Sequence, residues 1–236
     1  MRTDSSSSSA GPVSLAVTGT LAGSRLSRVL KRFASQHRDV ALTLRTATSA
    51  EVSDLIRRGE ATIGLRYDRD RSTDLDCELL FAEPLQVVCA PDHPLAGKRV
   101  AKLVDLSGEK WIAFPEVPGR REITASHVFA LFQTAGFGEI EWTAVDSLTA
   151  QKRLVEAGFG IALLSQSNAA EELGTGTIAT IRVGNLTAGH DIVAVTRHGG
   201  FLSTASRRLL EIIRADFTRA KSAVARAGSR SAARKR

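Results

Sequence analysis

The sequence predicts an α/β fold, because residues 11–65 alternate between the patterns of strands and of helices. Two stretches show the alternation of apolar residues that marks a half-buried strand, first at Val13, Leu15 and Val17 and then at Val40, Leu42 and Leu44. Between these stretches, apolar residues recur at the i, i+3, i+4 and i+7 spacing of an amphipathic helix, at Leu26, Val29, Leu30 and Phe33. Strands that alternate with helices favour a parallel sheet with right-handed crossover connections.

The second helix of this stretch is marked at both ends. Thr48 and Glu51 have the spacing of a capping box, which predicts a helix that begins near Ser49. The apolar residues that follow repeat the helical spacing, and Gly59 is a typical helix end. A third strand is predicted to follow, up to residue 65.

Hydroxyl-bearing residues follow each of the first two predicted strands. Thr18, Gly19 and Thr20 come after the first strand, and Thr48 and Ser49 come after the second. In open parallel sheets, ligands bind at the carboxyl ends of strands, next to helix N-termini whose N–H groups attract anions. These residues therefore predict a site for a carboxylate or another small anion. Helix capping is the alternative role for the same hydroxyl groups.

Beyond residue 65, the pattern predicts a second lobe inserted into the first. Pro84 separates two apolar runs and cannot donate to a strand ladder, so the chain is expected to enter the second lobe near residues 81–85. We assign residues 11–83 and 162–218 to lobe I and residues 84–161 to lobe II. The prediction is thus two Rossmann-like lobes joined by two crossover strands, and clefts between such lobes are preferred small-molecule sites.

The net charge of +7 is concentrated at the C-terminal end. Residues 219–236 hold seven of the 32 basic residues and no acidic one, and the remaining 25 basic residues match the 25 acidic ones. This segment is rich in Ala, Ser and Arg, which predicts a disordered, solvated basic tail. Weak, non-specific contact with nucleic-acid phosphates is its alternative role. Residues 1–10 are polar and rich in Ser, and they are also predicted to be disordered.

Cysteine usage and hydropathy indicate a cytoplasmic protein. Cys77 and Cys89 lack the spacing of a metal site, so we expect two free thiols and a buried, unreactive Cys89. No secretory signature is visible, and no apolar run approaches the roughly 18 residues of a membrane span. We therefore expect no membrane partner.

Common catalytic and cofactor motifs are missing from the sequence. It contains no GxSxG elbow, P-loop, GxGxxG or HExxH motif and no paired Cys/His cluster. The five histidines are scattered, at positions 37, 93, 127, 190 and 198. We expect no cofactor, no metal and no enzymatic activity. An enzyme whose acid and base meet only in space is the less favoured alternative.

Several segments resemble the effector-binding domain of LysR-type transcriptional regulators. They are GPVSLAVTGT, RVLKRFASQHRDVALTL, TATSAEVSDLIRRG, LQVVCAPDHPLA and VEAGFGIALLS, in this order over about residues 11–215. The resemblance implies the type 2 periplasmic-binding-protein fold and a small-metabolite effector in the interlobe cleft. It also implies a homodimer in which the first helix, about residues 22–36, and the second strand meet the other lobe of the partner. Such regulators begin with a winged helix-turn-helix that reads DNA bases. In this sequence the resemblance starts at the effector domain, so we expect no base-specific DNA contact by this chain.

The resemblance also implies a set of effector contacts. Thr18, Gly19 and Thr20 match the first effector loop of the family, and Thr48 and Ser49 match the second. The remaining matches are Phe114, Pro115 and Glu116 in the facing loop and Val145 and Asp146 in the last loop. Arg66 and Arg120 are candidate charge partners for an anionic effector, with solvated loop arginines as the alternative. A stand-alone solute-binding protein of the same fold, which would require export, is the alternative to a cytoplasmic sensor.

Overall fold

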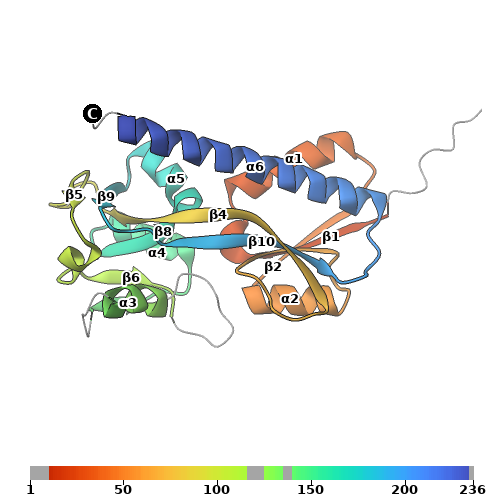
Figure 1. The fold of residues 1–236 in the computed structure, drawn as a ribbon, viewed down its shortest axis with the longest axis horizontal. Helices are drawn as coiled ribbons and strands as arrows, with labels where there is room; N and C mark the ends of the chain where they lie inside the picture. Colours follow the sequence, from red (N-terminus) through yellow and green to blue (C-terminus); the bar gives the residue numbers. More distant parts are fainter. Residues whose placement is uncertain (1–10, 116–124, 135–139, 234–236) are drawn as a thin grey trace, which may run out of the picture. The chain divides into compact units, whose positions relative to one another are not determined.

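The computed structural model describes residues 11–115, 125–134 and 140–233, and these residues form two α/β units (Figure 1). Unit 1 contains residues 1–82 and 191–236, and unit 2 contains residues 83–190. The chain passes twice between the two units, as the sequence predicted.

Unit 1 is built on a mainly parallel sheet with the strand order β2–β1–β3–β10. β1 (Val13–Thr18) pairs in parallel with both β2 (Leu42–Ala47) and β3 (Ile63–Tyr67), which confirms the prediction for residues 11–65. β10 (Gly189–Arg197) pairs antiparallel with β3. β2 begins two residues after Val40, because the N–H of Val40 bonds instead to the carbonyl of His37 in the preceding turn.

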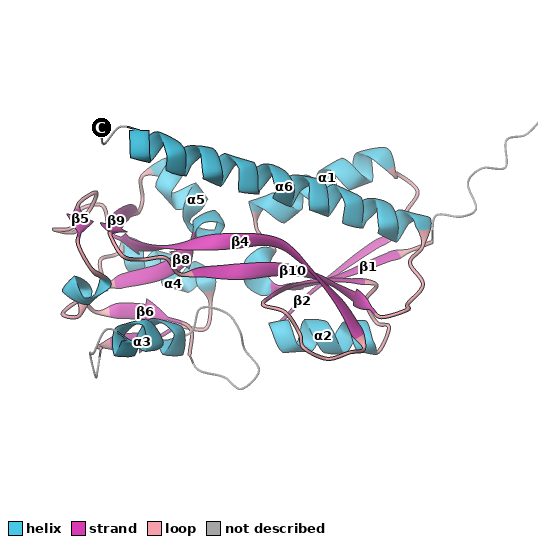
Figure 2. Ribbon diagram, in the orientation of Figure 1, coloured by secondary structure: helices cyan, strands magenta, loops and turns pink. Residues whose placement is uncertain are grey.

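Helices cover both faces of the unit 1 sheet (Figure 2). α1 (Ser24–Gln36) and α6 (Thr204–Ala233) pack on one face, where Leu15 and Phe33 belong to the same core cluster. α2 (Ser49–Arg57) packs on the opposite face, against a smaller cluster that includes Ala16, Val193 and Val195. The predicted stripe of α1 is confirmed, with three of its four apolar residues fully buried: Leu26, Val29 and Phe33.

Unit 2 contains a mixed sheet with the strand order β4–β8–β6–β7. These strands are β4 (Leu75–Cys89), β8 (Ile161–Ser165), β6 (Trp111–Ala113) and β7 (Trp142–Ala144). β9 (Ala179–Val183) pairs with the other side of β4, and β5 (Arg99–Val100) pairs with β9. The helices are α3 (Ala125–Thr134), α4 (Leu148–Glu156) and α5 (Gln166–Thr175), with short 3₁₀ turns at η1 (Gly19–Leu21) in unit 1 and η2 (Leu103–Leu106) in unit 2.

β4 runs without interruption through Pro84, which corrects the predicted break between two apolar runs. Proline removes only its own N–H from the ladder. The next residue restores the bonding, because the N–H of Leu85 donates to the carbonyl of Ala188 at 3.0 Å. The chain passes from unit 1 to unit 2 between Ala82 and Glu83, inside this strand.

The second passage lies between His190 and Asp191, and the predicted return to the first lobe at residue 162 is wrong. Residues 161–165 form a strand, β8, and this strand belongs to unit 2. β8 pairs antiparallel with β4 and parallel with β6, so the sheet of unit 2 holds it on both sides. An apolar run that is buried on both faces fits a central strand of either sheet, and the pattern alone does not distinguish them.

The predicted disorder is corrected for residues 219–233, and residues 234–236 lie outside the described residues. α6 begins at Thr204 and continues to Ala233, through most of the segment that was expected to be disordered. Ala, Arg and Lys are strong helix formers, and no proline interrupts residues 219–233. Residues 219–233, although polar and charged, can therefore continue α6, whose first part is anchored in the core of unit 1.

Candidate functional site

Hydroxyl groups from four elements of unit 1 (β1, η1, α2 and β3) meet at the carboxyl ends of β1 and β3 and at the start of α2. Thr18, the last residue of β1, and Ser49, the first residue of α2, are both fully buried, and Thr18 Oγ1 lies 3.1 Å from Ser49 Oγ. Ser49 Oγ also accepts a hydrogen bond from the N–H of Tyr67, the last residue of β3. Thr20 Oγ1 donates to Tyr67 Oη at 3.1 Å. We call Thr18, Thr20, Ser49 and Tyr67 the hydroxyl cluster.

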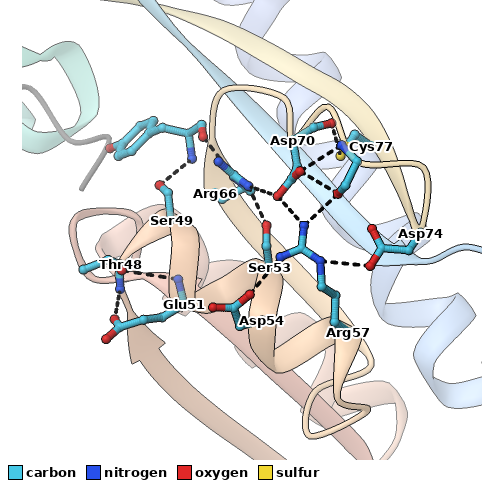
Figure 3. A network of polar contacts seen from close by, with 12 residues as sticks. Thr48, Ser49, Glu51, Ser53, Asp54, Arg57, Arg66, Asp70, Asp74 and Cys77 are labelled. Atoms are coloured by element: carbon cyan, nitrogen blue, oxygen red, sulfur yellow. Dashed lines mark hydrogen bonds and ion pairs between the residues drawn. The ribbon is translucent and has the colours of Figure 1, made fainter. Parts of the chain in front are cut away.

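A capping box fixes the start of α2, as the sequence predicted (Figure 3). Thr48 Oγ1 accepts a hydrogen bond from the N–H of Glu51, and Glu51 Oε2 accepts one from the N–H of Thr48 at 2.7 Å. Of the hydroxyl groups at the strand ends, the one on Thr48 therefore serves as the helix cap. The hydroxyl groups of Thr18 and Ser49 instead connect different elements of the unit.

The turn directly after β1 is open. Gly19 and Thr20 lie in η1, where Gly19 is exposed and Thr20 is half-buried. A Cβ atom built on Gly19 meets no heavy atom within 4 Å. The backbone of this turn therefore has free space in front of it, next to the buried hydroxyl groups of the cluster.

Arg66 is a buried residue of β3, which excludes the alternative of a solvated loop arginine. Its side chain is 6% exposed, and its Nη1 lies 2.8 Å from Asp70 Oδ2. Nη1 also donates to Ser53 Oγ, and Nε donates to the carbonyl of Tyr67 at 3.2 Å. The charge of Arg66 is thus balanced by Asp70 inside unit 1 (Figure 3). The hydrogen bond from Arg66 Nε helps to hold the backbone of Tyr67.

Arg57, at the end of α2, joins the same network. Its guanidinium group contacts the carboxylates of Asp54, Asp70 and Asp74 at 2.8, 3.0 and 2.9 Å. Burial of Asp70 acts to raise its pKa, but hydrogen bonds from Ser72 and the positive charge of Arg57 outweigh burial and hold the pKa well below its usual range. The ionised carboxylate of Asp70 therefore fastens the loop after β3 to α2.

The candidate residues of unit 2 also lie at strand ends. Phe114 and Pro115 follow β6, and Val145 and Asp146 follow its parallel neighbour β7. The N–H of Val145 donates to the carbonyl of Ala113 at 2.9 Å, which continues the pairing of these two strands. Phe114 is buried and Asp146 is exposed. Glu116 and Arg120 lie outside the described residues.

Sequence reasoning missed Tyr67, which belongs to the hydroxyl cluster, and it missed Ser53 and Asp70, which both contact Arg66. A signal for Tyr67 was available, because it is the only tyrosine of the chain and it ends the third strand. β3 is parallel to β1, so its carboxyl end lies at the same edge of the sheet, and Tyr67 at that end is a strand-end candidate like Thr18.

The cysteines show no features of a reactive or metal-binding site. Both are free, and Cys89 is fully buried, as predicted. Burial raises the pKa of the Cys89 thiol to about 11. Among the described residues, no group of three or more His, Cys, Asp or Glu side chains is arranged to hold a metal ion. The described part of the chain contains no helix with the length and hydropathy of a membrane span.

Several known proteins with a similar sequence are transcriptional regulators. The transcriptional dual regulator GltC of Bacillus subtilis is 28% identical over 162 residues, which are 68% of this chain and 53% of GltC. The chain thus spans about half the length of this curated relative.

Solved structures show the same fold. The effector-binding domain of BenM with its effector benzoate superposes with a TM-score of 0.75 and 22% identity, over 88% of this chain and 92% of that domain. The effector-binding domain of QuiR in complex with shikimate gives a TM-score of 0.73 and 17% identity, over 89% of this chain and 98% of that domain. These matches confirm the type 2 periplasmic-binding-protein fold.

The family match covers both units of the chain. The model of the family described as LysR substrate binding domain matches residues 6–218, which include every candidate site residue. The match agrees with the resemblance that the short segments of the sequence indicated. The protein therefore belongs to the LysR substrate-binding domain family.

Proposed function

We propose that this chain senses a small organic anion as the effector-binding part of a LysR-type transcriptional regulator. The observation that carries the proposal is the hydroxyl cluster, which gathers three strand and helix ends beside an open backbone turn. The BenM domain was solved with its effector benzoate and the QuiR domain with shikimate, and both ligands are carboxylates. This shared chemistry supports an anionic effector for the present chain.

The start of α2 has the electrostatic character that such an effector requires. The N-terminus of a helix carries the positive end of the helix dipole and N–H groups without an intrahelical acceptor. In our proposal, the backbone of Gly19 contacts the effector directly. Thr20 also contacts it, after its hydroxyl turns away from Tyr67 Oη, to which it donates in the structure. Arg66 acts as a positioning residue, because its charge is balanced by Asp70 while its Nε holds the carbonyl of Tyr67. The strand-end residues of unit 2 are proposed as further contacts, at Phe114, Pro115, Val145 and Asp146.

Calorimetric titration with a panel of aromatic, aliphatic and hydroxylated carboxylates tests this proposal. Thr20→Ala removes one hydroxyl group and is expected to weaken binding about tenfold, or about 1.4 kcal/mol. Gly19→Val adds side-chain atoms where the folded protein has free space, so it is expected to block binding while the melting temperature stays within a few degrees of wild type.

The matched control is Thr73→Ala, which removes an exposed hydroxyl group from the loop between β3 and β4. It is expected to bind as the wild type does. The proposal fails if no carboxylate of the panel binds the wild-type chain, or if Thr20→Ala and Gly19→Val bind with unchanged affinity.

We also propose a homodimer that uses α1 and β2. β2 is an edge strand among the described elements, and its four central residues are exposed, with Leu44 at 42%. An exposed edge with an apolar side chain favours association. Leu44→Arg is expected to shift the protein towards a monomer in light scattering, and Leu79→Arg, at a 52% exposed position in β4, is the control. A wild-type monomer at high concentration contradicts this proposal.

A regulatory role in the cytoplasm is proposed in preference to catalysis, since the matched relative GltC is a transcriptional regulator. A sensor returns its ligand unchanged. Prolonged incubation with the bound carboxylate, followed by chromatography, is therefore expected to recover the ligand quantitatively. Conversion of the ligand at a rate that depends on protein concentration would contradict this assignment.

A further inference from the structure

The C-terminal end of α6 differs in charge from the rest of the chain. Residues 219–236 contain Arg or Lys at seven positions and no acidic residue, while the remaining 25 basic residues are balanced by 25 acidic ones. The family match ends at residue 218, directly before this segment. The whole net charge of +7 therefore lies in an extension that follows the sensor domain.

The extension is helical over residues 219–233, where it continues from an anchored part of α6. Phe217 is the last buried residue among the described side chains of this helix, and Arg25 lies over its ring at 5.2 Å. Arg25 also forms an ion pair with Asp216. α6 then continues unbroken to Ala233, so that residues 219–233 extend the helix by about 22 Å. Four of the seven basic residues, at positions 219, 221, 226 and 230, thus lie on a helix that starts from the core of unit 1.

The spacing and composition of the extension favour binding to a soluble polyanion over binding to a membrane. Arg219, Arg226 and Arg230 recur at intervals of seven and four residues, which return to one side of a helical backbone. A helix that binds a membrane surface requires a face of large apolar residues. Between residues 219 and 236, Val224 is the only apolar residue larger than alanine. The charge pattern therefore favours phosphates over a lipid surface.

We propose that residues 219–233 of α6 form an arm that binds the phosphate backbone of duplex DNA without reading its sequence. The choice of DNA rests on the proposed function, because a regulator works beside its operator. A basic arm increases the affinity of the protein for DNA through contacts with phosphates, and it needs no contacts with bases. The sensor domain thereby contributes directly to DNA affinity.

The salt dependence of binding gives the expected magnitude. The helical extension holds four basic residues, at positions 219, 221, 226 and 230. Four phosphate contacts correspond to a slope of about −3.6 in a plot of log Kobs against log salt concentration, and to a loss of roughly 100-fold in affinity between 50 and 200 mM NaCl. Fluorescence anisotropy with a labelled duplex of mixed sequence, about 25 base pairs long, measures this slope for the full chain.

Two variants remove the charges in different ways. A chain that ends at Thr218 retains the buried residues of α6 and lacks the extension. The variant with glutamine at Arg219, Lys221, Arg226 and Arg230 keeps the length and the helix propensity. Both variants are expected to lose at least tenfold in affinity at 50 mM NaCl, with the slope reduced by about 3 to 4. The matched control replaces four exposed arginines of unit 1 with glutamine, at positions 69, 71, 197 and 207, and is expected to keep both the affinity and the slope.

Several results would overturn the inference. They are absence of binding to duplex DNA at 50 mM NaCl, an equal loss of affinity in the control, and tighter binding to single-stranded RNA or to phosphatidylserine vesicles than to DNA. Calorimetry with the carboxylate panel separates this proposal from the previous one. A chain that ends at Thr218, binds a carboxylate as the wild type does and no longer binds DNA supports the DNA-binding arm. A chain that binds DNA through the extension and binds no carboxylate contradicts only the anionic-effector proposal.

Discussion

Replacement of Asp70 with asparagine tests the network that fastens the loop after β3 to α2. Asp70 Oδ2 lies 2.8 Å from Arg66 Nη1 and 3.0 Å from Arg57 Nη2. Arg57 is 31% exposed and keeps its contacts with the carboxylates of Asp54 and Asp74 in the variant, so the stability lost at Arg57 is small. The loss at Arg66 dominates because its side chain is only 6% exposed, and a buried charge left without its partner costs about 3–5 kcal/mol. We expect the free energy of unfolding to fall by about 3 kcal/mol.

Urea denaturation followed by circular dichroism at pH 7 measures this loss as a shift of the midpoint at constant m-value. The matched control is Asp76→Asn. Asp76 pairs with His198 at 2.8 Å, but the two side chains are 59% and 68% exposed, and such pairs contribute only about 0–1 kcal/mol. A loss below about 1 kcal/mol for Asp70→Asn, or one equal to that of the control, would refute the assignment of a buried ion pair.

The same network predicts a pH dependence. The pKa of Asp70 is lower in the folded protein than in the unfolded chain, where it is about 3.9. The contribution of Asp70 to stability is therefore complete above the pKa of the unfolded chain and is lost progressively as the pH falls towards the folded pKa. Below about pH 4, the wild type should lose stability more steeply than Asp70→Asn. If the free energies of unfolding of the two proteins fell with equal slopes below pH 4, this prediction would be wrong.

Three further predictions concern local packing and reactivity. Thr48→Ala breaks the capping box of α2 and should cost about 1 kcal/mol in urea denaturation, and an unchanged midpoint would argue against the cap. Gly64→Ala places a Cβ atom 2.9 Å from Val52 Cγ1 and should cost about 1–3 kcal/mol, whereas Gly23→Ala meets nothing within 4 Å and serves as the control. A disulfide reagent at pH 8 should label half-buried Cys77 in the folded protein and Cys89 only in denaturant, because burial raises the Cys89 pKa to about 11. Equal labelling rates in the folded protein would contradict the assignment.

Elements defined by neighbouring residues could be predicted from the sequence. The capping box needs only Thr48 and Glu51, which are three residues apart, and the structure confirms both of its hydrogen bonds. The approach of Thr18 to Ser49 was also predictable, although 31 residues separate them. It follows from the parallel pairing of β1 and β2, because the ends of parallel strands meet at one edge of the sheet.

Features that depend on a choice between equivalent partners could not be predicted. β8 has the pattern of any central strand, and only its pairing with β4 and β6 assigns it to unit 2. The sequence also does not show which carboxylate pairs with Arg66, because four aspartates follow β3 within ten residues, at positions 68, 70, 74 and 76. The turn that follows Tyr67 selects Asp70, since only the folded loop brings this carboxylate back against α2.

Hydrogen-bond accounting separates the roles of the two hydroxyl groups at the proposed effector site. A serine hydroxyl offers one donor and two acceptor positions. Ser49 Oγ already accepts from the N–H of Tyr67 and shares a hydrogen bond with Thr18 Oγ1, so at most one of its positions is left for a ligand. Ser49 is also fully buried, whereas Thr20 is half-buried beside the open turn at Gly19. Ser49 therefore acts mainly by holding the ends of β1 and β3 in place. An effector that reaches this edge of unit 1 meets Thr20 and the backbone of the turn first.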